Sequence, residues 1–196
     1  MTRKFNGQDL LVATHNTSKM AEFRRLLSDT IAIKSATDVG LPDVEETGVT
    51  FLENAQLKAL HAAKYTNTPA LADDSGFCLD ALDGRPGLYS ARVAKKLGGY
   101  PQTFKSFDAE LDDKSRVARF ICVLCLAWTD GHVEHVEGNV QGQFVYPPLG
   151  DNGFGYDPVF IPDGYEMSFA QMGDAKNKIS HRGLAISQML DLCFLG

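Results

Sequence analysis

The pattern of apolar and polar positions alternates between strands and helices along the first half of the chain. A short apolar run indicates a strand, whereas apolar residues spaced three and four apart indicate a helix. These criteria predict a strand at 9–14, a helix from about 17 to 28, and a strand at 31–35. A further strand begins in "ALADDSGF" and is expected to break at Gly76.

The segment 50–65 has the clearest helical pattern. Thr50 and Glu53 have the spacing of a capping box, in which each side chain accepts a hydrogen bond from the other residue's backbone N–H. The apolar stripe that follows consists of Leu52, Ala55, Ala59 and Ala62. This stripe predicts which face of the helix is buried.

The second half of the chain combines longer strands with loops. Residues 82–101 contain several glycine and proline turn signals, so we expect mainly loop there, followed by a helix from about 101 to 112. The later predicted elements are strands at 117–129 and 132–146, a glycine-rich loop, the short strand "VFIP", and a helix from about 181 to 193. The predicted fold class is α/β with a mixed sheet.

Length and composition restrict the classes of function. With 196 residues, 44% of them hydrophobic and 22% charged, the chain is expected to form one soluble domain or two lobes that share a sheet. The net charge of −6 argues against broad binding to DNA or RNA, but does not exclude a small phosphorylated ligand. No signal-peptide pattern and no apolar run of roughly 18 residues is visible, so we expect a cytoplasmic protein that does not enter a membrane.

Cys122 and Cys125 form a CxxC pair inside "RFICVLCLAW", which has the pattern of a buried strand. Residues three apart in a strand face opposite sides of the sheet. We therefore interpret both cysteines as small buried apolar residues rather than as a zinc or redox site.

The turn at 14–19 joins the first predicted strand to the first predicted helix. It contains no glycine, so it is neither a P-loop nor a dinucleotide fingerprint. Ligands bind at the carboxyl ends of strands in open α/β sheets, and a helix N-terminus favours an anion. The side chains that could meet a phosphate are Thr14, Asn16, Ser18 and Lys19. The alternative is that Asn16 or Thr17 caps the helix while Lys19 lies in solvent.

Two further clusters combine carboxylates with other polar groups. Asn54, Lys58 and His61 share one face of the helix at 50–65, and Glu45 and Glu46 come just before that helix. Alternatively, the paired glutamates are only exposed surface residues with no role in a site.

Asp73 and Asp74 end a mostly apolar strand, where a charge must be paired or must hold a metal. Carboxylate oxygens suit Mg²⁺, although an aspartate could instead cap the following turn. Ser75 does not lie in a GxSxG elbow, and the histidines lack the spacing of metal ligands. The clusters therefore favour metal-assisted hydrolysis of a phosphate ester or anhydride.

Five stretches together resemble the inosine triphosphate pyrophosphatase family, which includes dITP/XTP pyrophosphatases. They are "ATHNTSK", "EETGVTFLENAQLKA", "ALADDSGFCLDALDGRPGLYSAR", "GFGYDPVF" and "KNKISHRG". The resemblance implies one domain over 1–196 with an elongated mixed β-sheet and flanking helices, forming two lobes around a central nucleotide cleft. It also implies a Mg²⁺-dependent homodimer that cleaves between the α- and β-phosphates of ITP, dITP or XTP.

The resemblance also implies roles for individual residues. Asp74 would be the catalytic residue and a Mg²⁺ ligand, together with Glu46 or Glu45, of which Glu46 is the closer match. The residues implied at the phosphates are Thr14, His15, Asn16, Thr17, Ser18, Lys19 and Lys58. Those implied elsewhere on the nucleotide are Ser75, Phe154, Gly155, Tyr156, Asp157, Lys176, His181 and Arg182.

The implied base contacts suggest how purines are distinguished. Phe154 would stack on the base, while His181 and Arg182 would donate to the C6 oxygen of hypoxanthine or xanthine, where adenine carries an amino group. The sequence departs from the family at His15, where glycine is usual, and over 93–115, which is shorter than expected. Two alternative functions are a pyrophosphatase for modified pyrimidine nucleoside triphosphates and a non-catalytic nucleotide sensor.

Overall fold

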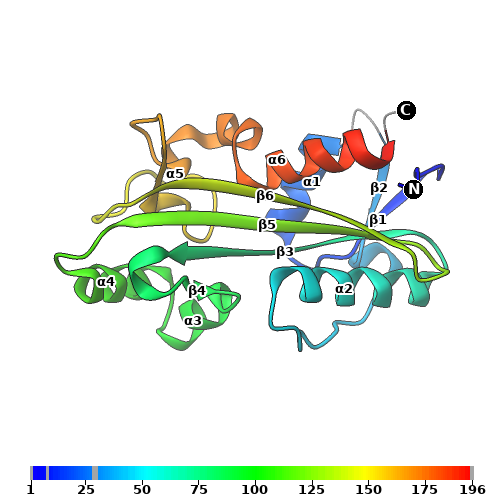
Figure 1. The fold of residues 1–196 in the computed structure, drawn as a ribbon, viewed down its shortest axis with the longest axis horizontal. Helices are drawn as coiled ribbons and strands as arrows, with labels where there is room; N and C mark the ends of the chain where they lie inside the picture. Colours follow the sequence, from blue (N-terminus) through cyan, green and yellow to red (C-terminus); the bar gives the residue numbers. More distant parts are fainter. Residues whose placement is uncertain (1, 8, 28–30, 195–196) are drawn as a thin grey trace. The chain divides into compact units, whose positions relative to one another are not determined.

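Figure 1 shows the computed structural model, which describes residues 2–7, 9–27 and 31–194. Its strands are β1 (Asp9–Val12), β2 (Ala32–Ser35), β3 (Ala70–Leu79), β4 (Arg85–Gly87), β5 (Val117–Ala127), β6 (Val133–Phe144) and β7 (Phe160–Pro162). Its α-helices are α1 (Thr17–Leu27), α2 (Phe51–Thr66), α3 (Ser90–Lys96), α4 (Tyr100–Leu111), α5 (Phe169–Met172) and α6 (His181–Met189). The expected end of the first helix at residue 28 lies outside the described residues.

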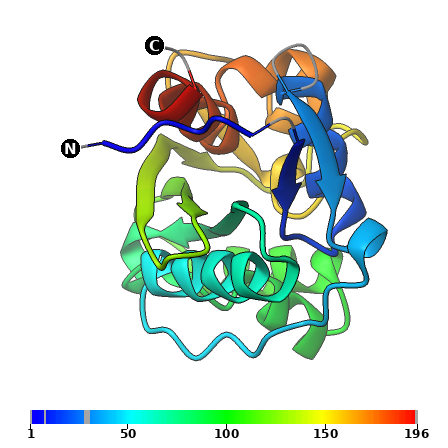
Figure 2. The same cartoon turned by 90° about the vertical axis from the view of Figure 1, so that its right-hand side faces the viewer.

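The strands form a mixed sheet in the order β2–β1–β3–β5–β6–β7, with β4 paired to β3. β1 runs parallel to both β2 and β3, whereas β4 and β7 are antiparallel to their partners β3 and β6. Figure 2 shows β1 and β2 side by side. Val12 pairs with Leu71, so the turn that follows β1 begins near the start of β3. The mixed α/β class predicted from the sequence is confirmed.

The chain divides into two compact units that share the long strands β3, β5 and β6. Unit 1 contains residues 1–74, 122–138 and 182–196, and unit 2 contains residues 75–121 and 139–181. Each unit has its own hydrophobic core. The core of unit 1 is built largely from aliphatic side chains of β1, α1, β5 and α6, whereas the core of unit 2 is rich in phenylalanine.

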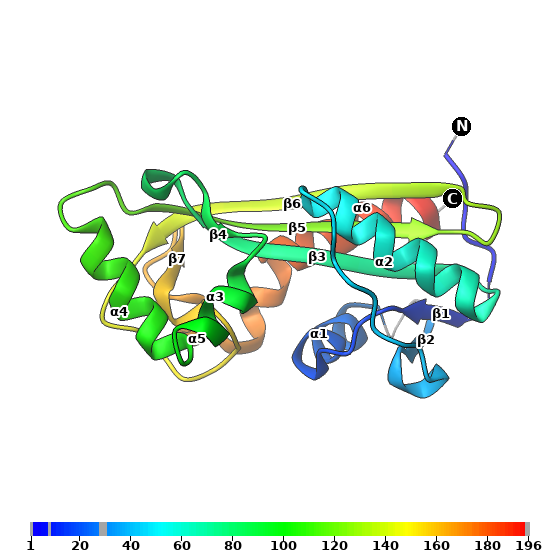
Figure 3. The same cartoon turned by 90° about the horizontal axis from the view of Figure 1, so that it is seen from below.

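The predicted amphipathic helices have the expected buried faces. In α1 the residues Met20, Phe23 and Leu27 are buried, as the apolar stripe predicted. In α2 the capping box of Thr50 and Glu53 is present. The stripe alanines Ala55, Ala59 and Ala62 are fully buried, whereas Leu52 keeps partial exposure. Figure 3 shows α2 alongside the first half of β3.

Two predictions about secondary structure are wrong. β3 does not break at Gly76 but continues to Leu79, because its second half pairs with β4 in the register Phe77 to Gly87. The segment 82–101 is not mainly loop, since it contains β4, α3 and the start of α4. The helix predicted from about 181 to 193 is confirmed, with α6 ending at Met189 and a π-helical turn continuing to Phe194.

Cys122 and Cys125 lie in β5 and are fully buried, as predicted from the apolar pattern around them. Both are free thiols. Burial raises the pKa of the Cys125 thiol to about 12, so the thiol stays protonated and unreactive at neutral pH. Within the described residues, no helix has both the length and the apolar character needed to span a membrane.

Candidate active site

The turn between β1 and α1 is organised by Asn16. Its side-chain oxygen accepts hydrogen bonds from the backbone N–H groups of Ser18 at 2.9 Å and Lys19 at 3.1 Å, so Asn16 caps α1. The backbone N–H of Asn16 in turn donates to the Thr14 hydroxyl at 3.2 Å. Thr17, the first residue of α1, is exposed. The capping role considered for Asn16 is therefore confirmed, but Lys19 does not lie in solvent.

His15 connects this turn to the segment that precedes α2. Its Nε2 atom lies 2.8 Å from the carbonyl oxygen of Leu41, and its Nδ1 atom lies 2.9 Å from a carboxylate oxygen of Asp43. The side chain of Asp43 is almost fully exposed, so the ion pair is a surface contact. His15 thus holds two backbone segments together.

Asp73 is the centre of a buried group of four charged side chains. Its Oδ2 atom accepts hydrogen bonds from Lys19 Nζ at 2.8 Å and from Arg182 Nη2 at 3.0 Å. Arg182 also donates through Nη1 to Glu22 on α1. The side chains of Asp73 and Arg182 are each only 2% exposed, and that of Lys19 is 19% exposed.

Asp74 has a separate set of partners from α2 and the segment before it. Lys58 Nζ lies 3.1 Å from Asp74 Oδ1 and 2.7 Å from Glu46 Oε1, so the lysine bridges two carboxylates. The Asn54 amide donates to Asp74 Oδ2 at 3.3 Å. Glu45 is exposed and Glu46 is partly buried, which favours Glu46 as the member of this cluster.

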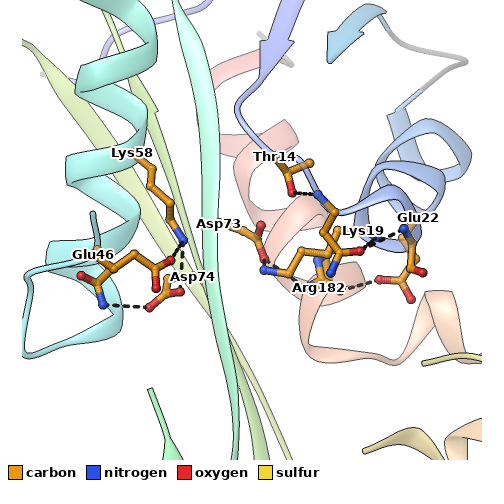
Figure 4. Close-up of polar contacts among 11 residues, drawn as sticks. Thr14, Lys19, Glu22, Glu46, Lys58, Asp73, Asp74 and Arg182 are labelled. Carbon is orange, nitrogen blue, oxygen red and sulfur yellow. Dashed lines mark hydrogen bonds and ion pairs between the residues drawn. The ribbon is translucent and has the colours of Figure 1, made fainter. Parts of the chain in front are cut away.

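The side chains of the two aspartates lie on opposite faces of β3 (Figure 4). Adjacent residues of a strand point to opposite faces, and Figure 4 shows Asp73 turned toward Lys19 and Arg182 while Asp74 is turned toward Lys58 and Glu46. The prediction that both acids end the strand is wrong, because β3 continues for five residues beyond Asp74. Neither aspartate caps a turn.

Electrostatic contacts shift the pKa values of both aspartates. Burial on its own would raise the pKa of Asp73, but Lys19 and Arg182 hold it well below its ordinary value, so Asp73 is ionised. Burial raises the pKa of Asp74, and the neighbouring Glu46 carboxylate adds to this, while Lys58 opposes it. Burial lowers the pKa of Lys58, but the surrounding carboxylates outweigh this and raise it. Asp74 is therefore the more basic of the two carboxylates.

The predicted base-contacting residues of unit 2 surround a second buried ion pair. Lys176 Nζ lies 2.5 Å from Asp157 Oδ2 and 5.0 Å from the centre of the Phe154 ring. The same carboxylate accepts a hydrogen bond from the Phe154 backbone N–H at 2.8 Å. Gly155 has a φ of 66°, a conformation that favours glycine. The structure therefore brings Phe154, Asp157 and Lys176 together.

Two further predicted residues pack in the aromatic core of unit 2. Tyr156 stacks on Phe77 with ring centres 4.8 Å apart, and its hydroxyl donates to the Ser90 carbonyl at 2.9 Å. His181 is buried and stacks on Phe120 with ring centres 4.5 Å apart. The nucleotide contacts predicted for Tyr156 and His181 stay predictions.

Comparison with known proteins decides the family. A family model described as the Ham1 family matches residues 10–192 of the chain. The chain belongs to the Ham1 family. A dITP/XTP pyrophosphatase of Rhodospirillum centenum is 48% identical over 198 residues, covering 98% of each chain. The resemblance inferred from the five sequence stretches is thereby confirmed.

Solved structures of the Ham1 family agree with the fold. A HAM1 protein from Coxiella burnetii has a TM-score of 0.85 and 40% sequence identity, covering 93% of this chain and 96% of that one. The Ham1 protein of Staphylococcus aureus has a TM-score of 0.83 and 35% identity, with the same coverage of both chains.

Two carboxylates of this Ham1 family chain have the chemistry of Mg²⁺ ligands. Asp74 and Glu46 converge on the single Lys58 amine, so two hard oxygen ligands already face a common point. Among the described residues, no cluster of three or more histidine, cysteine, aspartate or glutamate side chains could form a complete metal site. Mg²⁺ commonly binds one or two carboxylates and takes its remaining ligands from water and substrate phosphates. The donor set therefore fits a metal ion that is shared with a phosphate substrate.

The structure adds two site residues that sequence reasoning missed or left unassigned. Glu22 was missed because a glutamate in a helix is normally placed on the solvated face, yet here it pairs with Arg182. No local pattern signals this pairing, because Arg182 lies 160 residues away along the chain. Asn177 is nine-tenths buried, and its Oδ1 atom has no hydrogen-bond partner among the described residues. Buried polar atoms in folded proteins nearly always have a partner, so Asn177 Oδ1 is a candidate acceptor for a water molecule or a ligand.

We predict that Asp73→Asn changes how stability depends on pH. The pKa of Asp73 is lower in the folded protein than the ordinary value of about 3.9. Its contribution to stability is therefore complete above about pH 4 and is lost as the pH falls through the folded-state pKa. The variant should lose about 3–5 kcal/mol of unfolding free energy at pH 7, because two buried cations lose their partner.

Denaturant unfolding of both proteins between pH 7 and pH 3 measures this effect. The difference in unfolding free energy should shrink below about pH 4, because Asp73 of the unfolded wild type binds a proton there while Asp73 of the folded protein does not. Asp113→Asn changes an exposed aspartate and serves as the control. A difference that stays constant over the whole pH range would contradict the assignment.

Proposed function

We propose that this protein hydrolyses non-standard purine nucleoside triphosphates, namely ITP, dITP and XTP, to the nucleoside monophosphate and pyrophosphate. The observation that carries the proposal is the bridging of Asp74 and Glu46 by Lys58, while the preceding residue, Asp73, contacts Lys19 of the Asn16-capped turn. Relatives named dITP/XTP pyrophosphatases that match nearly the whole chain support it.

Unit 1 supplies the groups that handle the phosphates. Lys19 and Lys58 offer the charges that stabilise a pyrophosphate leaving group, and Thr14 and Ser18 offer hydroxyl groups. Ser75, the first residue of unit 2, directly follows Asp74 in β3 and is partly exposed, and we assign its hydroxyl to the nucleotide as well. His15 and Thr17 complete the segment that we assign to the triphosphate.

Asp74 is the general base in this proposal. Burial raises its pKa, which strengthens it as a proton acceptor, and Asn54 and Lys58 fix its orientation. The carboxylate takes a proton from water, and the water oxygen bonds to the α-phosphorus. The bond from the α-phosphorus to the bridging oxygen breaks, and the pyrophosphate leaves with the electron pair.

Mg²⁺ is the proposed cofactor, and Asp74 and Glu46 would hold it, with Glu45 as the weaker candidate. When bound, the ion neutralises negative charge on the phosphate oxygens during hydrolysis. We also propose, from the family resemblance, that the protein is a cytoplasmic homodimer.

The proposed base contacts come from the last part of the chain. Phe154 stacks on the base, and Lys176 with Asp157 provides a charged pair next to that ring. His181 and Arg182 donate to the C6 oxygen of the purine. Adenine carries an amino group at this position, so it would leave these buried donors unpaired at a cost of about 1–3 kcal/mol or more.

A release assay tests the proposal and its alternatives. Purified protein with Mg²⁺ is given ITP, dITP, XTP, dUTP or ATP, and pyrophosphate is measured separately from inorganic phosphate. Rapid pyrophosphate release from ITP, dITP and XTP is the expected result. Preference for dUTP would favour a pyrimidine enzyme, and tight ITP binding without release would favour a sensor.

We predict that Asp74→Asn lowers kcat for ITP by about 100-fold or more, because asparagine cannot accept the proton from water. The shape of the side chain and its contact with Lys58 can be retained, so the variant should still fold. Turnover is measured at saturating Mg²⁺, which separates loss of the base from weaker metal binding. Near-normal kcat under these conditions would remove Asp74 from the catalytic role.

A pair of variants distinguishes the two glutamates. Glu46→Gln should raise the Mg²⁺ concentration needed for half-maximal activity by at least about tenfold, because Glu46 shares Lys58 with Asp74. Glu45→Gln is the matched control and should change it little, since Glu45 is exposed. Mg²⁺ titrations of pyrophosphate release provide the measurement, and the reverse order of effects would reassign the ligand to Glu45.

We predict that Arg182→Lys lowers the ratio of kcat/KM for ITP to that for ATP by about tenfold or more. Lysine keeps a positive charge for Glu22 and Asp73 but lacks the planar fork of donors. The ITP to GTP ratio should change less, because guanine also carries an oxygen at C6. If the ITP to ATP ratio is unchanged in a folded variant, Arg182 does not contact C6.

A further inference from the structure

The Asp73 carboxylate presents one oxygen atom to two cations that come from distant parts of the chain. Lys19 Nζ and Arg182 Nη2 lie 2.8 Å and 3.0 Å from the same Oδ2 atom. Figure 4 shows the two cationic groups converging on this carboxylate. Because Asp73 and Arg182 are almost completely buried, little water is present to screen these charges.

Sharing one oxygen makes the positions of the two cations depend on each other. While Lys19 is present, it neutralises part of the charge on Asp73, and Arg182 is drawn less strongly to that carboxylate. If Lys19 is removed or turns fully toward another anion, Arg182 becomes the main counter-charge of Asp73. The guanidinium is then held more tightly by Asp73 and less effectively by any other acceptor.

We propose that Asp73 is a positioning residue that couples Lys19 to Arg182, so that a lysine at the phosphates also takes part in base selection. This inference rests on the proposed function, in which Lys19 contacts the triphosphate and Arg182 contacts the base. Lys58 provides the contrast, because its hydrogen bonds go to Asp74 and Glu46.

Lys19→Met tests the coupling through substrate selectivity. A lysine that only binds phosphate contributes equally to ITP and ATP, so its loss would lower both kcat/KM values by the same factor. With coupling, Lys19→Met should also lower the ITP to ATP ratio by about tenfold, a size typical of interacting charged residues. Lys58→Met is the matched control and should lower both values while leaving their ratio unchanged.

Two further variants exclude a merely structural effect. Lys19→Arg restores a cation next to Asp73 and should restore most of the ITP to ATP ratio. In Asp73→Asn the carboxylate that draws Arg182 away from other acceptors is absent, so adding Lys19→Met to it should lower the ratio no further. Leu10→Ala, a change in the core of unit 1, controls for lost stability and should leave the ratio unchanged.

Binding provides a readout for variants with little turnover. The affinities of IMP and AMP are measured by calorimetry, and the ratio between them should fall in Lys19→Met but not in Lys58→Met. The coupling would be overturned if Lys19→Met had the same ITP to ATP ratio of kcat/KM, or the same IMP to AMP affinity ratio, as the wild type. That result would leave the proposed function intact. A wild-type protein that releases no pyrophosphate from ITP would instead overturn the proposed function, and this inference with it.

Discussion

Burial of two adjacent aspartates in the middle of β3 is the constraint on which the arrangement of unit 1 depends. Neighbouring side chains of a strand face opposite sides of a sheet, so Asp73 and Asp74 are held by hydrogen bonds from different cations. Each buried carboxylate needs cations of its own to offset lost hydration. Lys19 and Arg182 provide them for Asp73, and Lys58 provides one for Asp74. The capped start of α1 and the polar face of α2 are thus fixed relative to β3 by charge as well as by packing.

The sequence predicted the structure correctly where the deciding residues lie within one helix. The capping box of α2 and the buried stripe of α1 formed as predicted, because their side chains interact within one or two turns of the same helix. Helical spacing also correctly put Asn54 and Lys58 on one face of α2, and both side chains contact Asp74. The position of Asp73 and Asp74 in a mostly apolar strand similarly indicated that each carboxylate must be paired with a cation or must hold a metal. The resemblance to a family then supplied roles that no spacing rule could supply.

Sequence reasoning failed where distant segments decide the outcome. Gly76 permits a turn, but pairing with β4 keeps it in an extended strand. The segment containing α3 is rich in turn residues, yet the Ser90 hydroxyl donates to the Gly87 carbonyl and accepts from the Phe77 backbone N–H, which joins the start of α3 to β3. Glu22 is buried because Arg182, 160 residues away, lies against it. None of these partners is visible in a local window.

The turn after β1 shows why capping and ligand binding are not exclusive alternatives. Asn16 uses the first free N–H groups of α1, so an anion that binds this turn gains less from the helix end than an uncapped helix would offer. Lys19 remains as the full charge, but it is already paired with Asp73. The Lys19 ammonium has three donors, so an incoming anion shares it with a buried carboxylate rather than with water alone. A triphosphate, with several negative charges close together, competes with that carboxylate better than a singly charged anion does. The buried pair thus also favours polyanionic ligands over simple ones.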